Sequence, residues 1–279
     1  MAPHITAASS YLFVPANRPE RYAKALESGA DAIIVDLEDA VALPQKEEAR
    51  ATLARWLRGN GPQARLWVRI NAADTVWHGD DLLTFSALSM AGIVLPKAED
   101  AKTLSSIARR LGPGRGLIAL IESAAGLAAM REIAAVPGVQ RLAFGSIDAQ
   151  VDLGMQCGPE EEELTHFRIE MVMASRLAGI APPIDGVTTD FNDDAFLTRV
   201  VQRARRMGFG AKLCIHPRQV DGVRRGFMPS ERELAWAEEV MAAVRAGDGG
   251  AISLKGKMID RPVILQAEKF LHQAGRLPH

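Results

Sequence analysis

Short apolar runs alternate along this chain with longer segments in which apolar residues recur at helical spacing. Eight such runs precede residue 216: residues 11–14, 32–35, 66–70, 92–95, 117–121, 141–144, 180–187 and 211–215. Because apolar residues follow one another within the runs, instead of alternating with polar ones, the pattern is typical of parallel strands covered on both faces. The seventh run fits this pattern least well, since Pro182-Pro183 interrupts it.

The segments between the runs have the pattern of amphipathic helices. Residues 44–58 begin with Pro44, which is favoured at the start of a helix, and residues 163–178 place apolar side chains three or four positions apart. Eight strand–helix units in succession, with no change in composition between them, favour a (β/α)8 barrel over a doubly wound open sheet. The sequence therefore predicts an α/β fold of the TIM-barrel class.

More sequence follows the eighth strand than a barrel needs. Residues 230–246 predict a helix with Ser230 as its N-cap, and a glycine-rich segment, 247–250, separates this helix from a tail over residues 251–279. We therefore predict a catalytic barrel domain over residues 1–229 and a C-terminal segment over residues 230–279. The tail of this segment is expected to act as a lid or as an arm for a neighbouring subunit.

The composition and charge of the chain exclude several classes of protein. Of its 279 residues 48% are apolar, which is ample for a large core, and the formal net charge of −1 gives no reason to expect a nucleic-acid or membrane-surface partner. Cys157 and Cys214 lie far apart without a CxxC spacing, so neither a disulfide nor a zinc site is predicted. The best candidate for a membrane span, residues 116–130, is interrupted by Glu122, and the N-terminus lacks a signal-peptide pattern. We therefore expect a soluble cytoplasmic protein.

Charged residues gather where the predicted strands end, and in a (β/α)8 barrel these ends form the active site. Glu122 directly follows the fifth strand, and Asp148 lies shortly after the sixth. Two carboxylates from successive strand ends are suitable anchors for Mg²⁺, with water and substrate oxygens as further ligands. Each acid can instead cap the helix that follows it, because helix N-termini favour negative charge. We favour the metal site, since seven of the eight strand ends carry a charged side chain or an imidazole within a few residues.

Arg69 lies within an otherwise apolar strand, residues 66–70. An arginine in this place is either paired with a nearby acid, such as Asp36 or Glu38, or grips a substrate carboxylate with two N–H groups. With a metal site predicted across the barrel, the carboxylate clamp is favoured. The nearby acids, Asp39 among them, can then orient the arginine or hydrogen-bond to water on the metal, although Asp39 can equally cap the next turn.

Three other strand-end features are open to two interpretations. His216 can act as a general base, but a buried, hydrogen-bonded structural histidine is an equal alternative. Lys97 can form a Schiff base, yet two metal-anchoring acids indicate that a metal stabilises an enolate instead. The glycine-rich segment 112–116 precedes a strand instead of opening a helix, so it predicts a turn and not a phosphate-binding loop.

The motifs at these strand ends resemble, in order and spacing, those of a known family. The matching segments are residues 12–21, 35–41, 68–71, 95–97, 121–123, 144–148, 214–217 and 256–262. Together they resemble the citrate lyase β-subunit-like branch of the HpcH/HpaI aldolase superfamily, which includes malyl-CoA and citramalyl-CoA lyases. The resemblance spans nearly the whole chain and is far more specific for the family than for the substrate.

The resemblance implies a Mg²⁺-dependent carbon–carbon lyase of the oxo-acid-lyase type. Such an enzyme cleaves a 3-hydroxyacyl-CoA thioester, for example citramalyl-CoA or malyl-CoA, to a 2-oxo acid and acetyl-CoA. On the matching positions Glu122 and Asp148 would be the metal ligands, and Arg69 would hold the carboxylate or enolate oxygen of the 2-oxo acid. Glu38 and Asp39 would organise the water molecules on the metal.

The remaining expected site residues come from loops and from the tail. Arg18 would face the coenzyme A side of the site, and the backbone N–H groups of Gly145 and Ser146 would add oxyanion stabilisation at a helix start. Asp260 resembles the family's acid/base residue and would reach into the site of an adjacent subunit, which implies a homotrimer or a hexamer. Ile147 is a departure, because some relatives carry an acid there, and this leaves the metal's outer contacts and the substrate choice open.

Three alternative functions remain at this stage. The first is the β subunit of a citrate lyase complex, which acts on a thioester of an acyl carrier protein. The second is a malyl-CoA-type thioesterase, in which water completes the reaction. The third, from another class, is a non-catalytic scaffold, and the presence of Glu122, Asp148 and Asp260 argues against it.

Overall fold

The computed structural model describes residues 8–246, 252–254 and 257–276. The chain divides into two compact units, Met1–Arg224 and Arg225–His279. The first contains the eight parallel strands and the second contains the last two helices. That residues 1–229 and 230–279 behave as separate domains remains a prediction.

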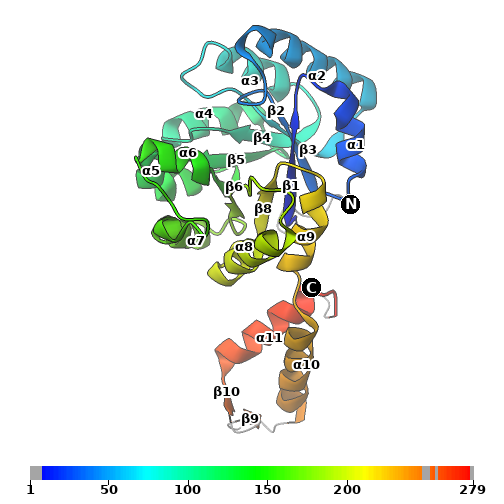
Figure 1. Ribbon diagram of the computed structural model, residues 1–279, viewed down its shortest axis with the longest axis vertical. Helices are drawn as coiled ribbons and strands as arrows, with labels where there is room; N and C mark the ends of the chain where they lie inside the picture. The colour runs from blue at the N-terminus through cyan, green and yellow to red at the C-terminus, as the bar shows by residue number, and fades with distance from the viewer. Residues whose placement is uncertain (1–7, 247–251, 255–256, 277–279) are drawn as a thin grey trace. The chain divides into compact units, whose positions relative to one another are not determined.

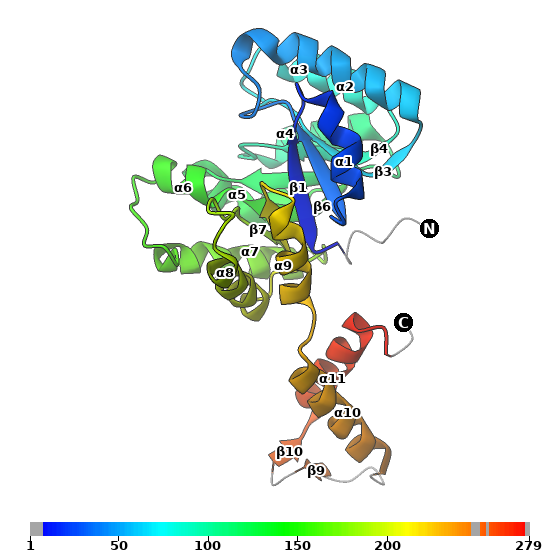
Figure 2. The ribbon, with the colours of Figure 1, turned by 45° about the vertical axis from the view of Figure 1, so that its right-hand side comes forward.

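The first unit is a closed barrel of eight parallel strands in sequential order, with helices outside it (Figures 1 and 2). The predicted TIM-barrel class is therefore confirmed. The strands are β1 (Ser10–Pro15), β2 (Ala32–Asp36), β3 (Gln63–Arg69), β4 (Met90–Leu95), β5 (Gly116–Ile121), β6 (Val139–Phe144), β7 (Ile184–Asp185) and β8 (Ala211–Cys214).

The seventh strand is shorter than the apolar pattern predicts. It comprises only Ile184–Asp185, whereas the run extends over residues 180–187. Pro182 and Pro183 have no backbone N–H to donate to a neighbouring strand, so regular pairing begins after them. The barrel still closes, because Ile184 pairs with β6 on one side and β8 on the other.

Helices follow the strands and cover the barrel. They are α1 (Tyr22–Glu27), α2 (Lys46–Asn60), α3 (His78–Ser86), α4 (Ala101–Leu111), α5 (Ala124–Ala134), α6 (Ser146–Asp152), α7 (Thr165–Leu177), α8 (Asp194–Met207) and α9 (Arg218–Phe227). Single 3₁₀ turns, η2 (Pro19–Arg21), η3 (Leu43–Gln45) and η4 (Glu162–Leu164), precede α1, α2 and α7. Pro44 belongs to one of these turns, and the α-helix proper begins two residues later than residue 44.

The inside of the barrel is packed with side chains from all eight strands. Trp67 is the largest of them and is 3% exposed. Two glycines make room for it: a Cβ atom at Gly92 would lie 2.7 Å from the indole, and one at Gly116 would lie 2.4 Å from it. Side chains larger than hydrogen are therefore excluded at both positions, and the barrel below the strand ends is a packed core.

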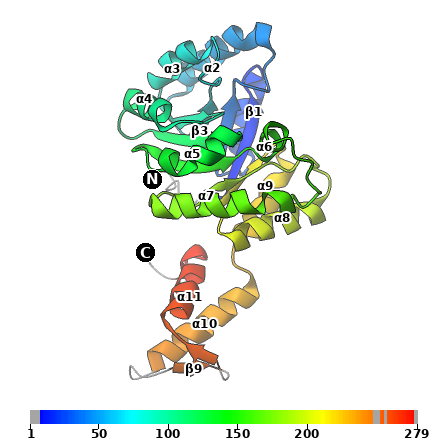
Figure 3. The same cartoon turned by 90° about the vertical axis from the view of Figure 1, so that its left-hand side faces the viewer.

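The second unit consists of α10 (Glu231–Ala246), a small antiparallel pair of β9 (Ile252–Leu254) and β10 (Lys257–Ile259), and α11 (Arg261–Gln273). The two helices run side by side (Figure 3). Ser230 and Glu233 form a capping box at the start of α10, with N–H···O distances of 3.3 and 2.8 Å, as the sequence predicted for Ser230. The glycine-rich segment 247–250 lies outside the described residues. Over the part of the chain that the structure describes, no helix has the length and apolar character needed to span a membrane.

Candidate active site

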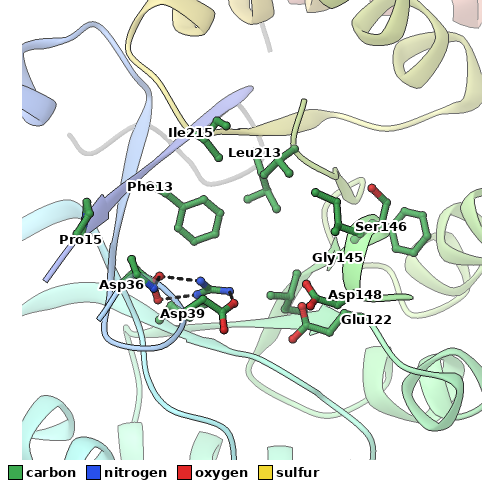
Figure 4. A pocket seen from close by; sticks show the side chains of 16 residues that line it. Phe13, Pro15, Asp36, Asp39, Glu122, Gly145, Ser146, Asp148, Leu213 and Ile215 are labelled. Atoms are coloured by element: carbon green, nitrogen blue, oxygen red, sulfur yellow. Dashed lines mark hydrogen bonds and ion pairs between the residues drawn. The ribbon is translucent and has the colours of Figure 1, made fainter. Parts of the chain in front are cut away.

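A pocket of about 390 Å³ opens at the C-terminal ends of the barrel strands. All of its lining residues belong to the first unit (Figure 4). The charged side chains of the lining are Asp36, Asp39, Arg69, Glu122 and Asp148, and the larger apolar ones are Phe13, Pro15, Leu120, Phe144, Ile147, Val187, Leu213 and Ile215. The structure therefore brings together residues that are as much as 200 positions apart in the chain.

Glu122 and Asp148 lie next to each other in this pocket (Figure 4). Glu122 follows β5 and is 4% exposed, while Asp148 lies in the exposed first turn of α6. The capping alternative is wrong for Glu122, because Ser123 caps α5 and accepts a hydrogen bond from Gly126 N at 3.2 Å. Asp148 is likewise not the N-cap of its helix.

Burial raises the pKa of the Glu122 carboxyl to about 7, and the Lys97 N–H and the Arg69 charge oppose this rise. A buried carboxylate of this kind gains from a bound cation. No cluster of three or more acidic, histidine or cysteine side chains suited to a metal occurs among the residues with described positions. The donor set is thus two carboxylates, which suits a hard divalent ion that takes its other oxygens from water and substrate.

Two neighbouring backbone features hold Glu122 in place. Lys97 has a φ angle of +45°, which is unusual for a residue other than glycine, and its N–H donates to Glu122 Oε1 at 2.8 Å. A Cβ atom at Gly145 would lie 2.4 Å from Glu122 Oε2, so the close approach of α6 requires glycine there. The Lys97 side chain is exposed and does not line the pocket, which argues against a Schiff base.

Arg69 forms ion pairs with nearby acids, which was the alternative to a substrate clamp. Its Nε and Nη2 donate to the two carboxylate oxygens of Asp36, each at 2.7 Å. Its Nη1 lies 2.9 Å from Glu38 Oε2, without hydrogen-bond geometry, and 3.3 Å from Asp39 Oδ2. Its Cζ lies 4.9 Å from the centre of the Phe13 ring. The guanidinium nevertheless lines the pocket, so the carboxylate clamp stays a prediction.

Burial and neighbouring charges have opposing effects on the pKa values of the cluster around Arg69. Burial alone would lower the pKa of Arg69, but the adjacent carboxylates, Asp36 first, outweigh this effect and raise it. Burial raises the pKa of the Glu38 carboxyl to about 8, against the opposing charge of Arg69. Asp36 also accepts from Glu38 N at 2.9 Å and from Ala40 N at 3.0 Å. Asp36, and not Asp39, therefore organises the turn after β2.

The predicted oxyanion donors need one correction. The Gly145 N–H donates to Ile121 O at 2.9 Å, so it is not free to bind a substrate oxygen. The reason is barrel geometry, since β6 continues its pairing with β5 through Gly145. Ser146 remains, as the first residue of α6.

The sequence did not point to Glu161, which anchors α6. It follows a loop in an acidic run, and its φ of +47° is visible only in the structure. Its Oε1 accepts from Ser146 Oγ at 3.0 Å and from Gln150 Nε2 at 3.4 Å, while its Oε2 pairs with Arg168. Arg168 in turn donates to the fully buried Asp185 at 2.9 Å. The start of the helix that carries Asp148 is thus tied to the barrel through buried charges.

Other predicted residues lie away from the pocket lining. Arg18 is exposed and pairs with Glu20 at 2.6 Å. His216 stacks on Phe191, with ring centres 4.6 Å apart, and its Nδ1 accepts from Arg218 N at 3.2 Å, so it is hydrogen-bonded but only half-buried, and the structural interpretation is met in part. Asp260 belongs to the second unit.

Comparison with known proteins places the chain in a family. A sequence model described as HpcH/HpaI aldolase/citrate lyase matches residues 9–217. The chain belongs to this family. The predicted resemblance is thereby confirmed, as is the prediction of an enzyme of the lyase type.

Three relatives and neighbours illustrate the range of this HpcH/HpaI family. A citrate lyase subunit beta-like protein of Mycobacterium tuberculosis is 36% identical over 96% of both chains. An L-malyl-CoA/beta-methylmalyl-CoA lyase of Cereibacter sphaeroides is 34% identical, over 94% of this chain and 93% of the relative. The crystal structure of protein CitE from M. tuberculosis, in complex with magnesium, acetoacetate and coenzyme A, has a TM-score of 0.87 and 36% identity, over 97% of this chain and all of that one.

Proposed function

We propose that this protein is a Mg²⁺-dependent lyase that cleaves a 3-hydroxyacyl-CoA thioester, of the citramalyl-CoA or malyl-CoA type, to a 2-oxo acid and acetyl-CoA. The observation that carries the proposal is the meeting of Glu122, Asp148 and Arg69 in one pocket at the strand ends. Related proteins support it, since a malyl-CoA lyase is 34% identical and CitE has been crystallised with magnesium and pyruvate.

Each residue of the pocket has a separate proposed role in the reaction. Glu122 and Asp148 would hold the ion, which supplies Lewis-acid stabilisation of the substrate's hydroxyl and carboxylate oxygens. Arg69, oriented by Asp36, binds the carboxylate that becomes part of the 2-oxo acid. Ser146, at the N-terminus of α6, offers its N–H to the oxyanion of the departing thioester enolate.

The outer parts of the site are proposed from the family resemblance. Glu38 and Asp39 organise water on the ion, and Arg18 contacts the coenzyme A side. Asp260 acts as the acid that protonates the enolate carbon, from the tail of a neighbouring subunit in a trimer or hexamer. In the described residues Asp260 is exposed and accepts a hydrogen bond from Val263 N at 3.2 Å, so it also caps α11.

The test of the function is an assay of purified protein with malyl-CoA, citramalyl-CoA and citryl-CoA, with Mg²⁺ and with EDTA. We expect a 2-oxo acid to be released only with Mg²⁺. A 3-hydroxy acid and free CoA would instead indicate a thioesterase, as a relative that is 34% identical is named. Turnover only on a thioester of an acyl carrier protein would indicate a citrate lyase β subunit, as another relative is named. Failure with all of these substrates would contradict the proposal.

Replacing Asp260 by Asn is expected to abolish most thioester chemistry while Mg²⁺ and 2-oxo acid binding persist. If the arm acts on a neighbouring subunit, mixing Asp260→Asn with Glu122→Gln protomers restores part of the activity, because some sites then combine an intact metal centre with an intact arm. Activity is measured after subunit exchange, with mixed oligomers verified by mass spectrometry. Verified mixed oligomers without any rescue would show that the arm does not act in trans.

Replacing Glu161 by Gln is expected to weaken Mg²⁺ binding about tenfold or more, the size typical of residues that orient metal ligands. Both carboxylate oxygens of Glu161 accept from donors, so the amide NH₂ must face either the Gln150 side-chain amide, which donates to Oε1, or the Arg168 guanidinium. Either clash loosens the start of α6 and displaces Asp148. The measurement is Mg²⁺ titration by calorimetry, with the melting temperature of the metal-free protein beside it.

The matched control is Glu160→Gln. Glu160 is the preceding residue, and its ion pairs are with Arg199 at 3.4 Å and Arg203 at 3.9 Å, both in α8 and not in α6. The Glu160→Gln replacement should leave the affinity for Mg²⁺ unchanged. A lower melting temperature for Glu161→Gln with unchanged Mg²⁺ affinity would assign Glu161 a purely structural role.

A further inference from the structure

Resting on the proposed function, we infer that this site selects thioesters whose hydroxyl-bearing carbon carries one carboxylate and an uncharged apolar substituent, such as a methyl group. A second carboxylate on that substituent is rejected, and Ile147 is a residue that enforces the selection. The product acid would then be of the pyruvate kind and not of the oxaloacetate kind.

The charge of the pocket lining disfavours a second carboxylate on the substrate. Among the described residues, its lining has four carboxylates, from Asp36, Asp39, Glu122 and Asp148, and one cation, Arg69. Even with a divalent ion bound, the lining keeps a net negative charge. One substrate carboxylate can pair with Arg69 and the ion. A second would be partly desolvated beside the acids without a cation of its own, which is costly.

The two buried lysines near the strand ends do not supply that missing cation. Lys46 Nζ is buried and donates to Leu37 O at 2.9 Å, to Glu38 O at 2.8 Å and to Asn71 Oδ1 at 2.6 Å. Lys212 is buried as well, and it donates to Gly186 O and lies 3.5 Å from Asp185. Both ammonium groups are therefore committed to structural acceptors, and neither lines the pocket.

The opposite side of the pocket is apolar. Phe13, Leu213 and Ile215 face the acids across the cavity (Figure 4). Ile147 adds to the apolar lining from the first turn of α6, next to Asp148 in the chain, and it is 41% exposed. Because Ile147 is exposed and lines the pocket, its apolar side chain can contact a bound substrate. A methyl or short alkyl substituent gains from this contact, whereas a carboxylate does not.

The experiment compares three CoA thioesters that differ only at the carbon that bears the hydroxyl. The substituent there is hydrogen in malyl-CoA, methyl in citramalyl-CoA and carboxymethyl in citryl-CoA. We expect kcat/KM for citramalyl-CoA to exceed that for citryl-CoA at least tenfold, the range by which pocket contacts discriminate substrates. Equal or better cleavage of citryl-CoA would overturn the inference while the proposed lyase function stands.

A gain of function tests Ile147 directly. Ile147→Arg places a cation at the pocket and should shift the citryl-to-citramalyl ratio of kcat/KM about tenfold or more towards citryl-CoA. The control is Val151→Arg on the same helix. Val151 is 78% exposed and does not line the pocket, so the ratio should stay within about twofold of the parent's. Equal shifts in both variants, or none in Ile147→Arg, would remove Ile147 from the selection.

Binding of product acids separates this inference from the proposed function. Oxaloacetate and 4-methyl-2-oxopentanoate have branched substituents of similar size, one charged and one apolar, and each is titrated into the Mg²⁺-loaded protein by calorimetry. Tighter binding of the apolar acid supports the inference, and tighter binding of oxaloacetate overturns it. If no thioester is cleaved, the proposed function fails, and these two titrations still decide what the pocket selects.

Discussion

Glu122→Gln and Asp148→Asn are each expected to abolish measurable Mg²⁺ binding and turnover while the barrel stays folded. Each change removes one of only two anionic protein ligands proposed for the ion, and a neutral amide is a poor substitute for a carboxylate on Mg²⁺. The fold should tolerate the change at Glu122, because burial already raises the pKa of this carboxyl to about 7 and the amide oxygen can still accept from Lys97 N. Mg²⁺ binding is measured by calorimetric titration, turnover by the rate of 2-oxo acid release, and folding by circular dichroism.

The matched control for this experiment is Asp152→Asn. Asp152 lies at the other end of α6 and accepts from Ala124 N at 2.7 Å, outside the pocket lining. Its replacement removes the same charge from the same helix and should leave Mg²⁺ affinity unchanged. If either pocket variant binds Mg²⁺ as tightly as the parent protein, that residue is not a ligand.

Arg69→Lys is expected to lower kcat/KM by about 10²-fold or more and to weaken inhibition by 2-oxo acids. Lysine keeps the charge, but it loses the planar fork that donates to Asp36 at two points and places a third nitrogen beside Glu38 and Asp39. The carboxylate of the substrate is then held by a single mobile ammonium group. Steady-state kinetics and the inhibition constant for pyruvate give the measurement.

The control for Arg69 is a second arginine with two acidic partners. Arg50 lies 3.1 Å from Asp81 and 3.3 Å from Asp80, away from the pocket. Arg50→Lys should change stability but not kinetics. Near-normal kinetics for Arg69→Lys, with a loss of stability like that of Arg50→Lys, would identify Arg69 as a structural ion-pair partner alone.

The sequence determined the fold and the two carboxylates, because both depend on local pattern. Continuous apolar runs predict parallel strands, and eight of them in series predict a barrel whose strand ends meet at one face. Glu122 directly follows β5, and Asp148 lies in the first turn of the helix after β6. The two strands are neighbours in a sequentially ordered barrel, so the proximity of the two acids follows from chain order alone. Family motifs at the same ends indicated a lyase.

Only the tertiary structure decided which partners these side chains take. The sequence left open whether Arg69 is paired with an acid or free to bind substrate. In the structure it is surrounded by acids from β2 and the loop after it, which lie 30 to 33 positions earlier in the chain. Gly145 was a predicted donor, but its N–H is used by the strand pairing. Glu161 gave no signal, because neither its left-handed backbone nor its contact with Ser146 is encoded by a local period.

The apolar side of the pocket shows most clearly what the sequence could not predict. Phe13 comes from β1 and Leu213 from β8, and only closure of the barrel by pairing of these two strands brings them together. Periodicity shows that a residue is buried in a strand, but not which distant side chain it meets, since that depends on the register and closure of the whole barrel. The sequence therefore determined which side chains lie at the strand ends, and the tertiary structure decided which other side chains surround them.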